Sequence, residues 1–327
     1  MTKVLYVGNF QAKDRFGDCF NTEEHYARGF EANGCTVVRA QENADPILTA
    51  EWLDELRREI RNRYDLLLFT RTWPQPPELV DVFREFEQAG TVTAAVHLDV
   101  FFGLSREHEL QHPMFTVQHV FTADGDHAAR FEAHGINHHW MRAGVVEDEC
   151  VRGTFRGEYD CDVAFVGSGA GYHDEWPHRQ NLIDFLRDTY GDRFHKYGGP
   201  ESATIRGRDL NDLYASAKIV VGDTLALKGN RTHYWSDRPY ETLGRGGFLI
   251  FPRIGALVRE ILDLPTFEFG DFGELAIHID YWLAHPEQRE VLRSRLQAHV
   301  KANCTYTHRA AELLCTVGLA DCAEKAA

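Results

Sequence analysis

Residues 159–171 read YDCDVAFVGSGAG, and this stretch decides the fold. Val163–Gly167 is an apolar run of strand length that ends in glycine. The small residues after it are typical of a tight turn leading from a buried strand into a helix. A helix is predicted next, near Trp176–Tyr190. Because this strand–turn–helix unit begins near the middle of a 327-residue chain, the sequence predicts that a second α/β unit starts here.

The first half of the chain shows the same alternation of apolar runs and amphipathic segments, which predicts a parallel sheet covered by helices. The predicted strands are Val4–Gly8, Thr36–Arg39, Asp65–Thr70, Val92–His97 and Val120–Ala123. The predicted helices are Glu23–Asn33, Glu51–Arg63, Pro77–Ala89 and Asp126–His134. Asn21 and Glu24 form a capping box for the first of these helices, which Gly34 ends.

After the restart the alternation continues to about residue 300. The further predicted strands are Arg193–Tyr197, Lys218–Gly222, Phe248–Phe251 and Phe267–Phe269. Helices are predicted at Asp209–Ala217, Pro239–Gly244 and Phe272–Leu283, and further helix from Pro286 to about Leu319.

These patterns predict an α/β protein with two doubly wound, Rossmann-like domains that face each other across a cleft. We expect an N-terminal domain over residues 1–150, a second domain over 151–300, and a helical tail over 301–327 that packs back toward the first. Small ligands bind such sheets outside the carboxyl ends of their strands. The loops after the strands are therefore where functional residues are expected.

Composition excludes several classes of protein. The formal charge of −15 argues against non-specific coating of nucleic acid or anionic membrane. No apolar stretch approaches the roughly 18 residues that cross a bilayer, and the N-terminus has no signal-peptide pattern, so a soluble cytoplasmic protein is expected. The seven cysteines include no C-x-x-C pair, and the 17 histidines show no H-E-x-x-H spacing. We therefore expect no protein metal site.

Two places in the first half are candidate sites. Gly8 and Asn9 follow the first strand, where a glycine lets backbone approach a ligand, although a plain structural turn explains them equally well. His97 and Asp99 follow the fourth strand, and strand alternation puts them on one face. Either could act as a base on an acceptor hydroxyl, or the two could simply bond to each other at the sheet edge.

The segment 196–253 departs from the charge of the whole chain. It holds nine Lys and Arg against six Asp and Glu, a local charge of +3. Lys228 and Arg231 fall in the long loop after a buried strand, where cations can bind a diphosphate. A solvated basic surface is the alternative explanation.

Residues 236–250 read SDRPYETLGRGGFLI, a short helix opened by Pro239 and followed by glycines that enter a buried strand. Glu241 lies in the first turn of this helix. A carboxylate there can accept two ribose hydroxyls, as acidic residues do in other nucleotide sites. Alternatively, it stabilises the amino terminus of its own helix.

The stretch from Arg238 to Ile250 resembles the donor-binding motif of GT-B glycosyltransferases, in particular the family-4-like group that includes spore maturation proteins of the CgeB type. The resemblance covers nearly the whole chain. It implies transfer of a sugar from a nucleotide diphosphate to an acceptor hydroxyl, with a UDP-sugar as the expected cosubstrate and without a protein-bound metal or a tightly bound cofactor.

The resemblance also implies roles for individual residues. Glu241 would hold the donor ribose, and Arg238 and Tyr240 would shape the same pocket. Cations would stabilise the leaving diphosphate, and Ser168 and Gly169 would lie beside it; the candidate cations are Lys228, Arg231 and, after them, Arg179. One departure from the family concerns the Glu-x7-Glu motif, because His233 stands where the first glutamate is expected.

Other activities fit the same residues. A sugar-nucleotide epimerase or hydrolase would use the same site without an acceptor, and a non-catalytic binder would bind the nucleotide sugar without turnover. The acceptor of a transferase is open between a small molecule, a glycan and a hydroxylated DNA base. The acidic balance disfavours DNA, since a duplex acceptor needs a basic groove and a base flipped out of the stack.

Overall fold

The computed structural model describes residues 1–10, 21–42, 49–70, 75–99, 102, 105–169, 178–199, 205–225 and 231–321. The chain forms two compact units. The first comprises Met1–Arg142 and Tyr306–Ala327, and the second comprises Ala143–Thr305.

The first unit is built on a six-stranded sheet in the order β2-β1-β3-β4-β5-β6. Every pairing in it is parallel, as expected for a sheet whose strands are joined by helices. The strands are β1 (Lys3–Gly8), β2 (Thr36–Gln41), β3 (Leu66–Thr70), β4 (Val92–His97), β5 (His119–Thr122) and β6 (His138–Trp140).

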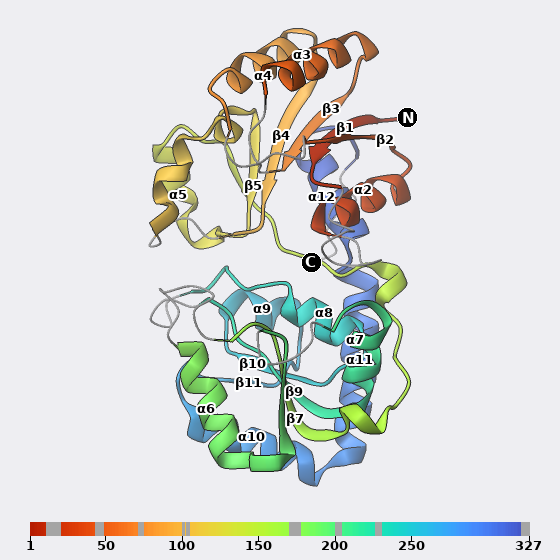
Figure 1. Cartoon of the computed structure of the whole chain (residues 1–327), viewed down its shortest axis with the longest axis vertical. Helices are drawn as coiled ribbons and strands as arrows, with labels where there is room; N and C mark the ends of the chain where they lie inside the picture. Colours follow the sequence, from red (N-terminus) through yellow and green to blue (C-terminus); the bar gives the residue numbers. More distant parts are fainter. Residues whose placement is uncertain are drawn as a thin grey trace. The chain divides into compact units, whose positions relative to one another are not determined.

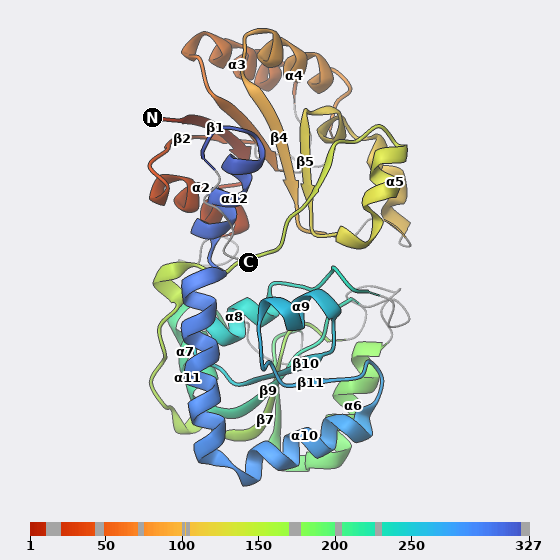
Figure 2. The same cartoon turned by 180° about the vertical axis from the view of Figure 1, so that it is seen from behind.

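Helices cover both faces of this sheet. They are α2 (Thr22–Ala32), α3 (Ala50–Glu59), α4 (Leu79–Gln88), α5 (Ala128–Ala133) and α12 (Tyr306–Thr316). Helices α3 and α4 lie on one side of the sheet and α2 and α12 on the other (Figures 1 and 2). Alternation along the strands builds the core, because Val7 and Phe69 point to the side where Phe83 and Phe86 of α4 are buried.

The last helix of the chain belongs to the first unit. Helix α12 packs against α2, where the rings of Tyr26 and Tyr306 lie 5.0 Å apart. The Asn33 side chain at the end of α2 donates to the Thr307 carbonyl at 2.8 Å. At the other end of α2, Asn21 Oδ1 accepts from the Glu24 N–H at 3.1 Å, as the capping pattern predicts.

The second unit is built on a five-stranded sheet in the order β11-β10-β9-β7-β8, again with every pairing parallel. Its strands are β7 (Cys161–Val166), β8 (Phe194–Tyr197), β9 (Ala217–Val221), β10 (Leu249–Pro252) and β11 (Thr266–Phe267). Strand β7 comes from the stretch that marks the restart of the pattern, and it lies inside the sheet with Val163, Ala164 and Phe165 fully buried.

Two groups of helices flank this sheet (Figures 1 and 2). The helices are α6 (His178–Tyr190), α7 (Gly207–Ser216), α8 (Arg238–Gly244), α9 (Gly255–Glu260), α10 (Phe272–Ala284) and α11 (Pro286–Asn303). Helices α6 and α10 meet through the stacked rings of Phe185 and Phe272, and α8 packs against α11.

The predicted α/β class with two Rossmann-like units is confirmed. Among the α-helices and β-strands of the described residues, the edge strand β6 and the short helix α9 were not predicted. The helix predicted from Pro286 to about Leu319 is two helices, because α11 ends at Asn303 and α12 begins at Tyr306. Between them the Cys304 carbonyl accepts from the Val145 N–H. The chain passes from the first unit to the second after Arg142, a few residues before the predicted boundary at 150.

Candidate functional site

The carboxyl edge of the second sheet carries closely packed glycine turns. Ser168 and Gly169 follow β7, and Gly198 and Gly199 follow β8. A Cβ on Gly198 would lie 3.1 Å from the Gly167 carbonyl oxygen, and the φ of Gly198 is +90°. Only glycine therefore suits this position, where two backbone turns meet.

Two arginines converge on one carboxylate at this edge. Arg179, in the first turn of α6, donates from Nε to Asp223 Oδ2 at 2.8 Å and from Nη2 to Oδ1 at 3.1 Å. Its Nη1 donates to both the carbonyl and the hydroxyl oxygen of Ser168 at 3.2 Å. Arg238 of α8 donates from Nη1 to the Val166 carbonyl at 2.9 Å and to Asp223 Oδ1 at 3.4 Å. These hydrogen bonds join the loops after β7 and β9 to the first turns of α6 and α8.

Lys196 of β8 adds a third cation beside the same turns. Its Nζ donates to the Gly198 carbonyl at 2.7 Å and would lie 3.7 Å from a Cβ on Gly169. We call Arg179, Lys196, Asp223 and Arg238 the edge cluster. Three cations and one carboxylate give these four side chains a net charge of +2, which suits a ligand with two or more negative charges.

The members of the edge cluster differ in exposure. The Arg179 and Asp223 side chains are 4% and 2% exposed, whereas that of Arg238 is 17% exposed. Arg179 and Asp223 therefore form the buried foundation, and Arg238 is the more accessible of the two arginines.

Glu241 lies three residues after Arg238 on α8, close to one helical turn away. Its Oε2 accepts from Arg245 Nε at 2.7 Å, and its side chain is 20% exposed. Arg245 also donates to Asn211 Oδ1 at 2.6 Å and to a Glu149 carboxylate oxygen. Among the described residues no donor reaches Glu241 Oε1, so this oxygen can accept a hydroxyl of a ligand.

Burial raises the pKa of Glu241 to about 7, against the lowering effect of Arg245. Asp237 and Glu149 raise it further by like-charge repulsion. The carboxylate is thus already desolvated before any ligand arrives.

The Tyr240 side chain extends from α8 into the core. It is fully buried, its hydroxyl donates to Glu260 Oε2 at 2.6 Å, and the Trp235 indole N–H donates to its oxygen at 2.9 Å. Its ring and hydroxyl are therefore committed to packing, and Tyr240 anchors α8 to the core.

The predicted cations of the loop before α8 have different outcomes. Lys228 lies outside the described residues. Arg231 is 6% exposed and its guanidinium lies 6.0 Å from the centre of the Tyr234 ring. His233, at the position of the expected first glutamate, hydrogen-bonds to the Thr232 hydroxyl at 2.8 Å. Of the candidate cations, Arg179 shares a carboxylate with Arg238, which the resemblance predicted only as part of the donor pocket.

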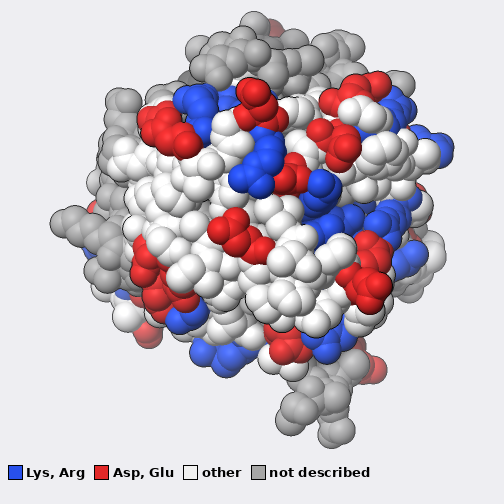
Figure 3. Space-filling model, turned by 90° about the horizontal axis from the view of Figure 1, so that it is seen from below, with Lys and Arg blue, Asp and Glu red and all other residues white. Residues whose placement is uncertain are grey.

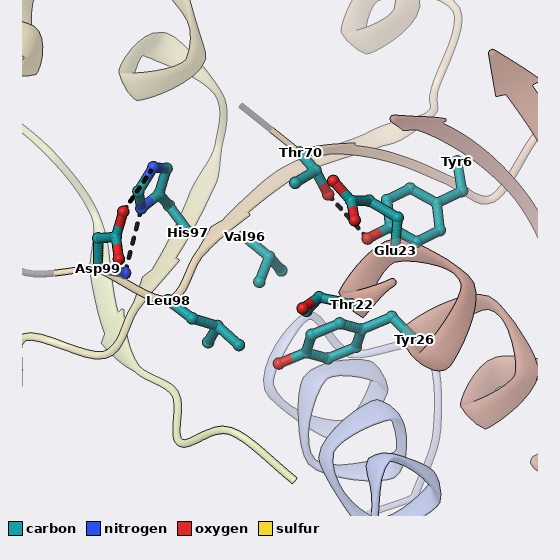
Figure 4. Close-up of a pocket in the computed structure, with 9 residues that line it drawn as sticks. All are labelled: Tyr6, Thr22, Glu23, Tyr26, Thr70, Val96, His97, Leu98 and Asp99. Atoms are coloured by element: carbon teal, nitrogen blue, oxygen red, sulfur yellow. Dashed lines mark hydrogen bonds and ion pairs between the residues drawn. The ribbon is translucent and has the colours of Figure 1, made fainter. Parts of the chain in front are cut away.

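The carboxyl edge of the first sheet holds a cavity of about 340 Å³ (Figure 4). Residues of three strand ends and of α2 line it; they are Tyr6, Thr22, Glu23, Tyr26, Thr70, Val96, His97, Leu98 and Asp99. The cavity is therefore at the place where parallel sheets bind small ligands.

His97 and Asp99 point toward each other at this cavity, as strand alternation predicts (Figure 4). The Asp99 N–H donates to His97 Nδ1 at 3.2 Å, so the ring proton is on Nε2, which lies 3.8 Å from Asp99 Oδ2. The His97 side chain is 8% exposed and that of Asp99 is 50% exposed. Asp99 therefore presents the accessible carboxylate, beside the buried ring of His97.

Gly8 has a role that sequence reasoning missed. A Cβ at Gly8 would lie 2.9 Å from Glu23 Cγ, so the glycine makes room for the Glu23 side chain. Asn9 is exposed, and its Oδ1 accepts from Gln41 Nε2 at 3.3 Å. The carboxylate beside this turn is thus Glu23, which lines the cavity and which the sequence showed only as an acidic residue at a helix start.

The described part of the chain holds neither a cluster of metal ligands nor a helix that could span a membrane. Within it, no three His, Cys, Asp or Glu side chains are grouped as metal ligands. Likewise, none of the described helices is long and apolar enough to cross a bilayer.

Charges on one face of the molecule are mixed in sign. On the face in Figure 3, Lys and Arg side chains alternate with Asp and Glu side chains. This arrangement is typical of surface ion pairs rather than of a stripe that follows a phosphate backbone.

Comparison with known proteins places the fold. Residues 175–315 match a family model described as glycosyl transferase-like. A sequence comparison with curated proteins found no match.

Solved structures share the fold at low identity. Anabaena HepE in complex with UDP-glucose is 12% identical with a TM-score of 0.58, and the match covers 97% of this chain and 100% of that one. T4 phage BGT in complex with its UDP-glucose substrate is 11% identical with a TM-score of 0.58, covering 97% and 99%. An E. coli structure described as trehalose-6-phosphate bound with UDP-2-fluoro glucose is 9% identical with a TM-score of 0.64, covering 97% and 99%. The two units thus match the GT-B fold.

Proposed function

We propose that the chain is a glycosyltransferase that binds a nucleoside diphosphate sugar at the carboxyl edge of the second sheet. The observation that carries this proposal is the edge cluster, with Glu241 one helical turn from Arg238. A charge of +2 beside glycine turns suits a diphosphate, and a desolvated carboxylate next to it suits ribose hydroxyls. The match of residues 175–315 to a glycosyl transferase-like family supports the assignment.

A UDP-hexose is the proposed donor, and UDP-glucose is the first to test. Three proteins with this fold were solved with UDP-glucose or its 2-fluoro analogue. Within the glycosyltransferases, we assign the chain to the CgeB-type group on the motif Arg238–Ile250.

In the proposed reaction, an acceptor oxygen forms a bond to C1 of the sugar while the bond from C1 to the diphosphate oxygen breaks. Asp99 takes the proton of the acceptor hydroxyl, and His97 holds Asp99 in position. The electron pair of the broken bond leaves with UDP, whose charge the edge cluster stabilises in place of a metal ion. Lys228 and Arg231 are proposed to act on the same diphosphate.

The assignment is tested by measuring UDP release from UDP-glucose, with and without a mixture of hydroxylated acceptors and with EDTA present. We expect release that depends on the acceptor and persists in EDTA. Consumption of donor without any acceptor indicates an epimerase or hydrolase, and binding without turnover indicates a sensor.

Glu241→Gln keeps the size of the side chain and removes the charge that ribose hydroxyls would contact. We expect it to lower kcat/KM by about tenfold to a hundredfold, as for a lost hydrogen bond to a charged group. The exposed Glu287→Gln is the matched control. Full activity in the Glu241 variant would contradict the proposed donor site.

A further inference from the structure

The cavity of the first unit is acidic where the edge cluster is basic. Glu23 and Asp99 line it from opposite ends (Figure 4), and no Lys or Arg is among the described residues that line it. The other polar groups of the lining are mostly hydroxyls, from Tyr6, Thr22, Tyr26 and Thr70. A ligand with hydroxyl groups therefore finds both acceptors and donors in this cavity.

A buried hydroxyl of the lining has no partner. Tyr26 is fully buried, and its hydroxyl oxygen makes no hydrogen bond with any described residue. In Figure 4 the hydroxyl end of Tyr26 points toward the open middle of the cavity, on the side of Leu98. Leaving such a group unpaired destabilises the folded state, and a hydroxyl of a bound ligand would remove that penalty.

A second carboxylate stands behind Glu23. Glu42 follows β2, where its N–H donates to the Gly8 carbonyl at 3.1 Å, and Glu23 packs over the same glycine. The buried Glu42 Oε2 has no hydrogen-bond partner among the described residues. Two neighbouring carboxylates taken out of water favour a cation beside them.

We propose that this cavity binds an acceptor that carries both hydroxyl groups and an amine, of the size of a single amino sugar. The ammonium group lies against Glu23, with Glu42 behind it, and a hydroxyl of the acceptor pairs with Tyr26. The reacting hydroxyl lies at Asp99, which takes its proton. This inference rests on the proposed glycosyl transfer and names its acceptor.

The titration of the two glutamates agrees with this geometry. Burial raises the pKa of Glu23 to about 7, and burial together with repulsion from Glu23 raises that of Glu42 to about 7. A bound ammonium group lowers both pKa values, so the two carboxyl groups ionise and attract it. A bound phosphate or carboxylate group would raise both pKa values further and be repelled by the ionised carboxylates.

The test measures acceptor binding by calorimetry on the full chain without any donor, so it does not depend on transfer. Glucosamine, glucose and glucose 6-phosphate form the matched series, which changes charge at nearly constant size. We expect glucosamine to bind at least tenfold more tightly than glucose, and glucose 6-phosphate more weakly than either. Equal binding of glucose and glucosamine, or preference for the phosphate, overturns the proposal.

Two variants locate the contacts. Glu23→Gln should weaken glucosamine binding by roughly tenfold to a hundredfold, the range for a hydrogen bond to a charged group. It should change glucose binding by less than about threefold. The exposed Glu55→Gln on α3 is the matched control. Tyr26→Phe should weaken the binding of both sugars, by roughly five- to tenfold for one neutral hydrogen bond.

The outcomes separate this proposal from the proposed function. If glucosamine binds through Glu23 but UDP-glucose does not bind, the cavity stands and the transferase assignment fails. If UDP-glucose is turned over and only a hydroxymethylated DNA oligonucleotide accepts the sugar, the transferase stands and the amine acceptor is wrong.

Discussion

The two sheets present opposite charge at equivalent edges. Both are parallel, and both have charged side chains where the strands end. The first edge offers the carboxylates of Glu23 and Asp99 among hydroxyls, and the second offers the cations of the edge cluster. Parallel sheets bind ligands at this edge, and the side chains after the strands set the charge that each candidate site favours in a ligand.

The two edges also differ in how their charge is held. Asp223 is 2% exposed between two arginines, so the second edge is preorganised by buried ion pairs. Burial raises the pKa of both Glu23 and Glu42 at the first edge, where no described lysine or arginine lines the cavity. We infer that the charges of the second edge are preorganised before a ligand binds. Those of the first edge gain their counter-charge only from a bound ligand.

The largest effect is expected for Asp99→Asn, which distinguishes catalysis at the first edge from donor binding at the second. Asp99→Asn removes the proposed base and keeps its shape, so transfer should slow by about 10²- to 10⁴-fold, the range for general base catalysis. Binding of UDP-glucose should stay within about twofold of the wild type. Single-turnover rates and calorimetry measure the two quantities.

His97→Gln is the companion variant, because the amide can still accept from the Asp99 N–H. A positioning role predicts a smaller loss of rate than in Asp99→Asn and an unchanged KM for the donor. A full rate in Asp99→Asn would show that the base lies elsewhere.

The next effect tests the buried foundation of the second edge. Asp223→Asn leaves Arg179 buried without its carboxylate, which costs about 3–5 kcal/mol for a broken buried pair. Urea unfolding should show this loss in the transition of the second unit. Asp184→Asn, at a half-exposed pair on α6, should cost less than about 1 kcal/mol. Equal losses in the two variants would mean that the edge cluster is not preorganised.

The smallest effect concerns the pH dependence of the first edge. The pKa values of Glu23 and Glu42 rise from 4.5 to about 7 on folding, so the folded state binds more protons between these values. The free energy of unfolding should therefore fall as pH rises from about 4.5 to 7. Glu23→Gln should raise the melting temperature by about 2–4 °C at pH 8, as for about 1 kcal/mol, and leave it unchanged near pH 4. A shift of the same size at both pH values would contradict an ionisation effect.

The sequence predicted the fold well because burial dominates its pattern. Val92–His97 was predicted with the bounds that β4 has, since its apolar residues are enclosed by the sheet. Strand β6 was missed because its residues, His138, His139 and Trp140, are all half-buried at the sheet edge and show no apolar alternation.

The candidate site was predictable only where the signal was local. The motif at Arg238 and Glu241 is visible in a few consecutive residues, and strand alternation pairs His97 with Asp99. Asp223 was only one acid in a loop, because its partner Arg179 is 44 residues away. Glu23 was missed for the same reason, since Gly8 and Thr70 come together with it only in the folded sheet.

The most direct test of the account is the affinity of the second edge for UDP-glucose, measured by calorimetry in wild type, Arg238→Ala and the exposed control Arg295→Ala. We expect Arg238→Ala to weaken binding by roughly tenfold to a hundredfold, as for a lost charge-assisted hydrogen bond to phosphate. Arg295→Ala should bind as the wild type does. Equal affinity in all three proteins, or no binding of UDP-glucose by the wild type, would contradict the proposed donor site.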